Sequence, residues 1–494
     1  MRVLAIAVLG LLTLASSAWA DLVTIRVPGT DLALTIEGRL RYNPGGTVFF
    51  YHPKLGKLVL DANTDIIERW EADSHEEIVR RKMNSARTAE EMMDAADYAL
   101  SHALVSKVYE AAEEAIKLDP QNKRAAGVLD LQKKMQVDLG DYSEEEKKIR
   151  AEVRNDDMIV AVSPHFILLH DTPTTLPRDS LRKKIRSEER LELLELVYES
   201  FLLKFYAKGK RLQIPDERLM VVLFHEEQDF YAYAEEKSPE LGSAIGFWDP
   251  KTNISFFFDH GSSESFRELR EVAARMQDRK EELLVRARND PSINVADYRR
   301  RADMVQMLVE IDQENSDIEV VSHECTHQMA GNTGLFPRHI RTPSWMHEGL
   351  ATYFEAPSEA SWSGIGAVNE MRLGLYKVLA EQDTERSNVD FIVGDQIFTD
   401  AASHMATLHG YSQAWALTHF LMEKHFDEFM TFYGALAEMP PDVFLHEELL
   451  TEIFDDCFRK DREALNSEWH RYMRGLRTEK ENIMSGDSIS GSFR

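Results

Sequence analysis

Cysteine is scarce in this sequence, which has only Cys325 and Cys457 among its 494 residues. At most one disulfide can therefore form. Cys325 lies inside a histidine motif described below, where a cross-link would constrain the site, so we expect the two thiols to remain unpaired. Cys325 is also a poor candidate for a metal ligand, because its position two residues after the first histidine points away from the histidine face of a helix.

Basic residues are outnumbered, with 58 Lys and Arg against 85 Asp and Glu, and the formal net charge is −27. Such an acidic surface argues against a nucleic-acid partner and against electrostatic docking on anionic lipid. Long apolar runs are also missing. The run at residues 3–14 is too short for a comfortable membrane span, and no later stretch approaches one. We therefore expect no membrane association once the N-terminal segment is removed.

The N-terminus has the features of a secretory signal peptide. Met1-Arg2 supplies a minimal positive start, an apolar run follows, and Ala18-Trp19-Ala20 gives an A-x-A pattern before Asp21. We expect residues 1–20 to be cleaved after Ala20 and the protein to be exported to the periplasm or the extracellular space. The cleavage point is not followed by cysteine, so a lipoprotein anchor is not expected.

The chain is long enough for two or three domains with a large core. Residues 21–63 show short alternating strands and a strong turn, which predict a small β unit. Residues 64–140 have a helical pattern. Residues 141–157 are strongly charged and are predicted to be a solvated linker. Residues 481–494 are predicted to be a disordered tail.

Part of the helical segment, from Ala112 through Pro120 to Ala126, resembles the end of one tetratricopeptide repeat and the start of the next. Small residues at helix crossings and a proline closing the second helix suit tight stacking of helix hairpins. Fewer than two repeats are visible, so we expect a helical appendage, with residues 87–140 as a possible site for a protein partner. An ordinary helical hairpin is an equally good interpretation.

Residues 158–480 are predicted to form the main domain, of α+β class. Apolar segments at residues 158–162, 165–169, 219–224 and 253–258 predict strands. The segment at 219–224 is continuously apolar and should be central in a sheet. Residues 190–205 predict an amphipathic helix. Residues 262–315 predict long, highly charged helices, which suggests a solvated excursion that could serve as a flap near the site.

A metal-binding pattern begins at His323-Glu324-Cys325-Thr326-His327, an H-E-x-x-H sequence. On a helix, His323 and His327 lie on one face and can direct their imidazoles to a single point. Glu348 follows 21 residues after His327 and is a third ligand candidate. Two histidines, a carboxylate ligand and a free glutamate are the components of a hydrolytic zinc site, with Glu324 placed to act on water. A buried helix with two satisfied core histidines is the alternative.

The surrounding residues predict how these elements begin and end. Gly331-Asn332 should stop the first helix, and Thr342-Pro343 should start the second as its N-cap and first residue. Thr352 and Glu355 lie on the Glu348 face and are candidates for orienting the ligands, with ordinary helix-surface residues as an equally good interpretation. His347 should point elsewhere and is not a predicted ligand.

The combined pattern H-E-x-x-H and W-x-x-E-G-x-A-x-Y-x-E resembles the gluzincin metallopeptidases, and more closely a bacterial domain of unknown function with a peptidase-MA-like core. The resemblance implies a thermolysin-like fold, zinc held by His323, His327 and Glu348, and Glu324 as general base. It also suggests Tyr411 as the residue that stabilises the oxyanion, with a purely structural tyrosine as the alternative. The G-x-M-E-N signature of exopeptidases is absent.

These observations predict an exported zinc metallopeptidase that acts on a peptide or protein substrate. Residues 246–258 are predicted to line its cleft and to pair with an extended peptide. Two alternatives stay open: a helical-repeat binding or scaffold protein whose zinc site is structural or vestigial, and a zinc hydrolase of a non-peptide amide.

Overall fold

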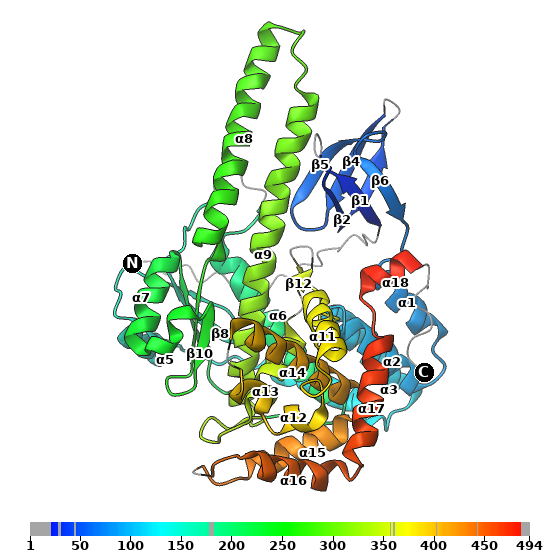
Figure 1. The fold of residues 1–494 in the computed structure, drawn as a ribbon, viewed down its shortest axis with the longest axis vertical. Coiled ribbons are helices and arrows are strands. Elements are labelled where there is room, and N and C mark those ends of the chain that lie inside the picture. Colours follow the sequence, from blue (N-terminus) through cyan, green and yellow to red (C-terminus); the bar gives the residue numbers. More distant parts are fainter. Residues whose placement is uncertain are drawn as a thin grey trace.

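A mixed α+β architecture confirms the predicted fold class. The computed structural model describes residues 21–27, 31–43, 46–176, 182–355, 357–358, 361–401, 403–441 and 443–485. Small antiparallel sheets occupy its N-terminal part, and a five-stranded mixed sheet and many helices follow (Figure 1). The predicted signal peptide lies outside the described residues. Among the described residues, no helix combines the length and apolar character needed to cross a membrane.

The N-terminal β unit consists of two three-stranded antiparallel sheets, ordered β2-β1-β6 and β3-β4-β5. Their strands are β1 (Leu22–Arg26), β2 (Ala33–Glu37), β3 (Arg39–Tyr42), β4 (Thr47–His52), β5 (Gly56–Asp61) and β6 (Ile66–Trp70). Alternating buried residues such as Val48 and Phe50 fill the space between the sheets. Strand β6 lies beyond residue 63, inside the range predicted to be helical, because Ile66 pairs with Ile25 of β1 and completes the first sheet.

The helical segment follows as α1 (His75–Ser85), α2 (Ala89–Leu100), α3 (Val105–Leu118), α4 (Lys123–Met135) and α5 (Ser143–Val153). A capping box between Thr88 and Glu91 starts α2. Buried alanines, including Ala96 and Ala112, permit close packing of α2 on α3. Helix α5 occupies the range predicted to be a solvated linker, because its Ile149 is buried beside the main sheet.

The main sheet has the order β10-β11-β9-β8-β7. Its strands are β7 (Ile159–Val162), β8 (Phe166–His170), β9 (Leu219–Phe224), β10 (Gly246–Asp249) and β11 (Ile254–Phe258). Strands β8, β9 and β11 run parallel, whereas β7 and β10 are antiparallel to their neighbours. Strand β9 is buried throughout its length and central, as predicted. Helix α6 (Arg186–Ala207) packs against one face, and α5 and α7 (Glu227–Lys237) cover the other.

A helical hairpin of α8 (Glu264–Asn289) and α9 (Ala296–Asn332) projects from the body (Figure 1). Helix α9 is continuous over 37 residues, since its sequence has no glycine or proline before Gly331, and it carries the histidine motif at its C-terminal end. The projecting part, which we call the arm, consists of α8 and the N-terminal part of α9 (Figure 1). It extends away from the motif, so its position does not match the predicted flap over the site. One side of α9 is covered by the β unit through Met304, Met307 and Ile311.

A buried ion network joins α9 to α6 just before the histidine motif. The guanidinium groups of Arg186 and Arg190 contact both Glu314 and Asp317, at distances between 2.5 and 3.3 Å. Lys54 of the β unit reaches the same Glu314 at 2.9 Å. Buried charges are stable only when paired in this way. The network therefore fixes the axial position of α9 relative to α6 and the β unit.

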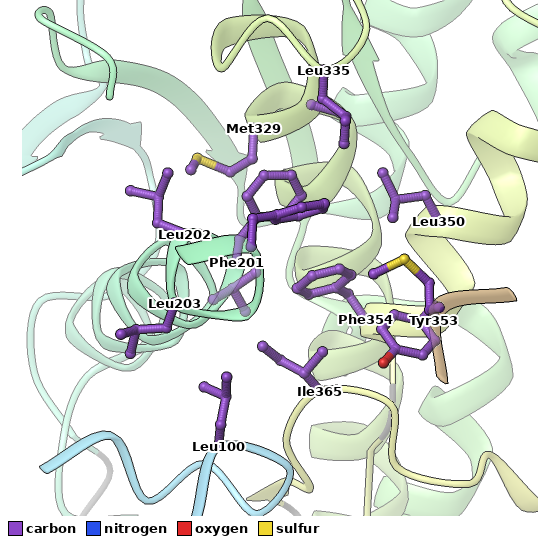
Figure 2. Packing of buried hydrophobic residues seen from close by; sticks show 14 of the residues in the cluster. Leu100, Phe201, Leu202, Leu203, Met329, Leu335, Leu350, Tyr353, Phe354 and Ile365 are labelled. Atoms are coloured by element: carbon purple, nitrogen blue, oxygen red, sulfur yellow. The ribbon is translucent and has the colours of Figure 1, made fainter. Parts of the chain in front are cut away.

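The remaining helices form the core beside α9. They are α10 (Ser344–Phe354), α11 (Glu370–Gln382), α12 (Val389–Val393), α13 (Gln396–Thr399), α14 (His404–Lys424), α15 (Phe426–Ala437), α16 (Glu447–Phe458) and α17 (Arg462–Gly475). Figure 2 shows where α6, α9 and α10 meet, with the rings of Phe201 and Phe354 5.1 Å apart. Helix α18 (Glu479–Ser485) continues into the range predicted to be disordered, and residues 486–494 lie outside the described part.

Candidate metal centre

The end of α9 and the middle of α10 bring three potential ligands together. The Nε2 atoms of His323 and His327 lie 3.1 Å apart, as expected for residues one helical turn apart on the same face. The Oε2 atom of Glu348 lies 3.1 Å from Nε2 of His323 and 3.6 Å from Nε2 of His327. The structure thus assembles all three residues that the sequence predicted as ligands into one triangle.

The size of this triangle fits a metal ion. Ligand atoms about 2.0–2.2 Å from a tetrahedral zinc ion are about 3.3–3.6 Å apart. The side chains are largely buried, with exposed fractions of 12% for His323, 9% for His327 and 22% for Glu348, so the triangle still reaches solvent. The group could hold a metal. Cys325 is a buried free thiol in the helical core, outside this triangle.

Helix α10 is held close to α14 so that Glu348 reaches the histidines. Gly349 has no room for a side chain, because a Cβ atom there would lie 2.3 Å from Thr418 Oγ1 and 2.8 Å from the Ala414 carbonyl oxygen of α14. The start of α10 differs from the prediction. Residue Pro343 occupies the N-cap position and Thr342 does not cap the helix.

The capping group comes from elsewhere in the chain. The carboxylate of Asp395, just before α13, accepts hydrogen bonds from the backbone N–H groups of Ser344 and Trp345 at 2.8 and 2.9 Å. Two donors of the first turn are thereby satisfied. Local spacing could not reveal this contact, since about fifty residues separate the partners.

His323 is oriented by Glu355, one of the two predicted positioning residues. Glu355 Oε2 lies 2.8 Å from Nδ1 of His323, which leaves Nε2 directed at Glu348. The other oxygen, Oε1, accepts from Arg372 of α11 at 2.6 Å. Thr352, the second predicted residue, instead donates its hydroxyl to the backbone carbonyls of Glu348 and Gly349. Orientation of a ligating histidine by a carboxylate is typical of metal sites.

His323 and Glu348 stabilise each other's charged forms. Burial alone would lower the pKa of His323, but hydrogen bonds to Glu348 and Glu355 outweigh it, so this pKa lies well above its usual value. Burial would raise the pKa of Glu348, yet the charge of His327 and hydrogen bonds from both imidazoles bring it well below the usual value. The negative carboxylate of Glu348 is therefore balanced by positively charged imidazole. A bound dication would supply this positive charge in place of the imidazole proton.

Glu324 lies next to the triangle and not in it. Its burial raises the pKa of its carboxyl group, and the neighbouring charges of His323 and His327 offset only part of that rise. The backbone N–H of Trp248 in β10 also offsets part of the rise in this pKa. A Cβ atom on Gly246 of the same strand would lie 2.5 Å from Val320 and 3.4 Å from Glu324, so the strand approaches α9 closely. A carboxylate whose pKa is raised toward neutrality is suited to proton transfer.

Tyr411 of α14 lies at the same site, although the sequence placed it 63 residues after Glu348. Its ring centroid is 6.2 Å from that of His323, and the guanidinium of Arg372 lies 5.4 Å from the ring centre. Burial and the nearby carboxylates of Glu348 and Glu324 raise the pKa of its hydroxyl. The phenol is therefore protonated and able to donate a hydrogen bond.

His347 was predicted to point away from the site, but its ring stacks on that of His327 with the centroids 4.2 Å apart. Burial and the charge of His327 lower its pKa to about 3, so it is neutral near pH 7. The ring of Phe336 also stacks on that of His347, with the two centroids 5.4 Å apart. The residue remains outside the triangle of ligand atoms, and it supports His327 by packing.

Comparisons with known proteins match one part of the chain to a family model and give no activity. Residues 317–442 match the model of a family described as "Protein of unknown function (DUF1570)". This range begins six residues before His323 and covers α10 and α14, so it contains every candidate residue named above except those of β10. The chain matches no curated protein and no solved structure.

Proposed function

We propose that this protein is an exported zinc metallopeptidase of gluzincin type, with a thermolysin-like catalytic domain. The observation that supports it most strongly is the triangle of His323, His327 and Glu348, whose separations of 3.1, 3.1 and 3.6 Å suit a tetrahedral ion. Mixed imidazole and carboxylate ligands favour zinc over calcium or magnesium, which prefer all-oxygen sites. Export rests on the signal-like residues 1–20.

Each residue then has a distinct role. When bound, zinc would act as a Lewis acid that makes water a stronger acid and polarises a carbonyl group. Glu324 takes a proton from the attacking water and passes it to the departing amine, because its raised pKa suits both steps. The protonated Tyr411 hydroxyl donates a hydrogen bond to the developing oxyanion. Glu355 holds the imidazole of His323 in orientation.

The substrate that this arrangement favours is an extended peptide. Among the described strands of the main sheet, β10 is an edge strand that pairs only with β11, and we propose that an extended peptide adds along its other edge. The same strand lies close to Glu324, since a Cβ atom on Gly246 would be 3.4 Å from that side chain. A peptide added along β10 would lie beside the general base, with main-chain hydrogen bonds that do not depend on its sequence.

The decisive experiment compares Glu324→Gln with the wild type. We expect the variant to keep its zinc and to lose cleavage of an unfolded protein by a factor of about 10² to 10⁴, the usual contribution of a general base. Glu268→Gln on the exposed surface of α8 is the matched control and should cleave normally. Zinc content by mass spectrometry and cleavage of a peptide library are the two measurements.

The outcomes separate the alternatives. Normal cleavage by Glu324→Gln would show that another group is the base. The zinc-loaded wild type could instead cleave no peptide and bind a partner protein through residues 87–140. That result would favour the scaffold interpretation, with the tetratricopeptide-like segment as the binding part. Hydrolysis confined to non-peptide amides, lost in Glu324→Gln, would keep the mechanism and change the substrate class.

A further inference from the structure

A second group of potential metal ligands lies where α18 meets α1 and the end of α2. His75 opens α1, His102 follows the end of α2, and Glu479 opens α18. One ligand atom from each lies within 4.8 Å of the other two. Figure 1 shows α18 beside α1, and Glu479 Oε1 lies 2.9 Å from Nε2 of His75. We propose that these three residues form a second divalent-metal site, with zinc as its ion, that fastens α18 to the helical segment.

The tautomer of His102 supports this assignment. Its Nδ1 atom lies 2.7 Å from the backbone carbonyl oxygen of Tyr98, and a carbonyl can only accept a hydrogen bond. Nδ1 therefore carries the proton and the lone pair of neutral His102 is on Nε2. Donation of the second ring N–H to a backbone carbonyl is the usual arrangement for a ligating histidine.

His75 is held by the same tyrosine. Its Nδ1 atom lies 3.0 Å from the Tyr98 hydroxyl, whose oxygen can accept a hydrogen bond from the N–H group at that position. Nε2 is then left for the metal, on the side where Glu479 lies. The rings of His75 and His102 are 4.0 Å apart, so both imidazoles reach the same region. One residue, Tyr98, thus orients both histidines through its hydroxyl and its carbonyl.

The ligand set repeats that of the first centre, with two imidazoles and one carboxylate, which suits zinc. The side chains of His75 and Glu479 are 30% and 34% exposed, so an ion can enter from solvent. The ligands are separated by as many as 404 positions in the sequence, between 75 and 479. Metal bound here would tie α18 to α1 and α2, and a metal that binds only the folded chain stabilises it.

Zinc stoichiometry of the full-length chain tests this proposal. We expect two zinc ions per chain in the wild type and in the control His404→Gln, whose side chain is exposed on α14. Glu479→Gln and His102→Gln should each hold one fewer. Equal zinc content in the wild type and in both variants would overturn the proposal, whether or not the first centre is loaded.

A second measurement does not depend on counting ions. Trypsin cuts after Arg477 and Lys480, which flank Glu479, so attachment of α18 should protect these bonds. Zinc added to the chelator-treated wild type should slow cleavage there several-fold, with no such protection in Glu479→Gln. Equal cleavage of the wild type with and without zinc would contradict the proposal, because the ion would then not fasten α18.

Discussion

Arg372 Nη2 lies 2.6 Å from Glu355 Oε1, while the other oxygen of the same carboxylate lies 2.8 Å from Nδ1 of His323. A side chain of α11 is thereby connected through one glutamate to a ligand on α9. Burial would raise the pKa of Glu355, but Arg372 and the hydrogen bond from His323 bring it below the usual value. Glu355 is therefore ionised and accepts both hydrogen bonds.

Glu355→Gln should weaken zinc binding by a factor of about 10 to 100, the usual effect of removing an outer partner of a ligating histidine. The amide is neutral and no longer favours the required tautomer of His323. Competition with a chromophoric chelator measures the affinity. Glu370→Gln at the exposed start of α11 should bind zinc like the wild type. Unchanged affinity in Glu355→Gln would show that the imidazole is oriented by something else.

Glu348→Gln should remove the carboxylate ligand and with it the zinc of the first centre. Added zinc raises the melting temperature of a protein that binds it in the folded state, by an amount that grows with the ratio of zinc to Kd. To isolate the first centre, both proteins compared should carry Glu479→Gln. Stabilisation by zinc in this background should disappear with Glu348→Gln and persist with Glu268→Gln. Equal stabilisation would mean that Glu348 is not a ligand.

Tyr411→Phe should leave zinc content unchanged and lower kcat by about 10²- to 10³-fold, the typical cost of removing one donor to an oxyanion. The ring remains beside Arg372 and Phe398, so the packing of α14 is retained. Tyr42→Phe in the β unit, 55% exposed, is the control. A change in KM alone would assign Tyr411 to substrate binding.

Asp395→Ala should destabilise the chain by about 1 kcal/mol, the usual cost of losing a helix cap. Both backbone donors at the start of α10 would lose their partner. Urea denaturation measures the change in the free energy of unfolding. Asp400→Ala, at an exposed position after α13, should change it by far less. Identical midpoints for the two variants would indicate that water replaces the cap without cost.

The ion network before the histidine motif should make the protein sensitive to acid. Burial would raise the pKa of Asp317, but Arg186 and Arg190 outweigh it and the pKa lies below its usual value. Glu314 is lowered in the same way by Arg190, Lys54 and Arg186. A lowered pKa in the folded state gives stability that is present above the unfolded value, about 4, and is lost as the pH falls below it.

Thermal unfolding between pH 7 and pH 3 tests this predicted loss of stability with falling pH. The melting temperature of the wild type should fall steeply below about pH 4. Asp317→Asn should be less stable at neutral pH and should show a shallower fall. A parallel decline of both proteins with pH would place the acid sensitivity elsewhere.

Short-range patterns predicted much of the site. The spacing of His323 and His327 requires a helix for both to reach one point, and the structure has it. The central place of β9 followed from its uninterrupted apolar sequence. The sequence also indicated Glu355 as a positioning residue, since it lies on the same face as Glu348.

Short-range sequence patterns could not predict the contacts between distant segments. Asp395 replaces the predicted Thr342 cap, and His347 stacks on His327 because of how α10 packs on α9. The pairing of β6 with β1 is not visible in the local sequence, so the range of β6 is predicted to be helical. The charged sequence of α5 predicts a linker because Ile149 is its one buried apolar residue.

The continuity of α9 has a mechanical consequence. A helix of 37 residues is about 55 Å long, and this one extends from the arm to His323 and His327 without a break. The β unit contacts this helix near its middle through Met307 and the Lys54–Glu314 ion pair. The arm and the two histidines therefore lie on opposite sides of this contact, and α9 has no break between them at which a displacement of the arm could be absorbed.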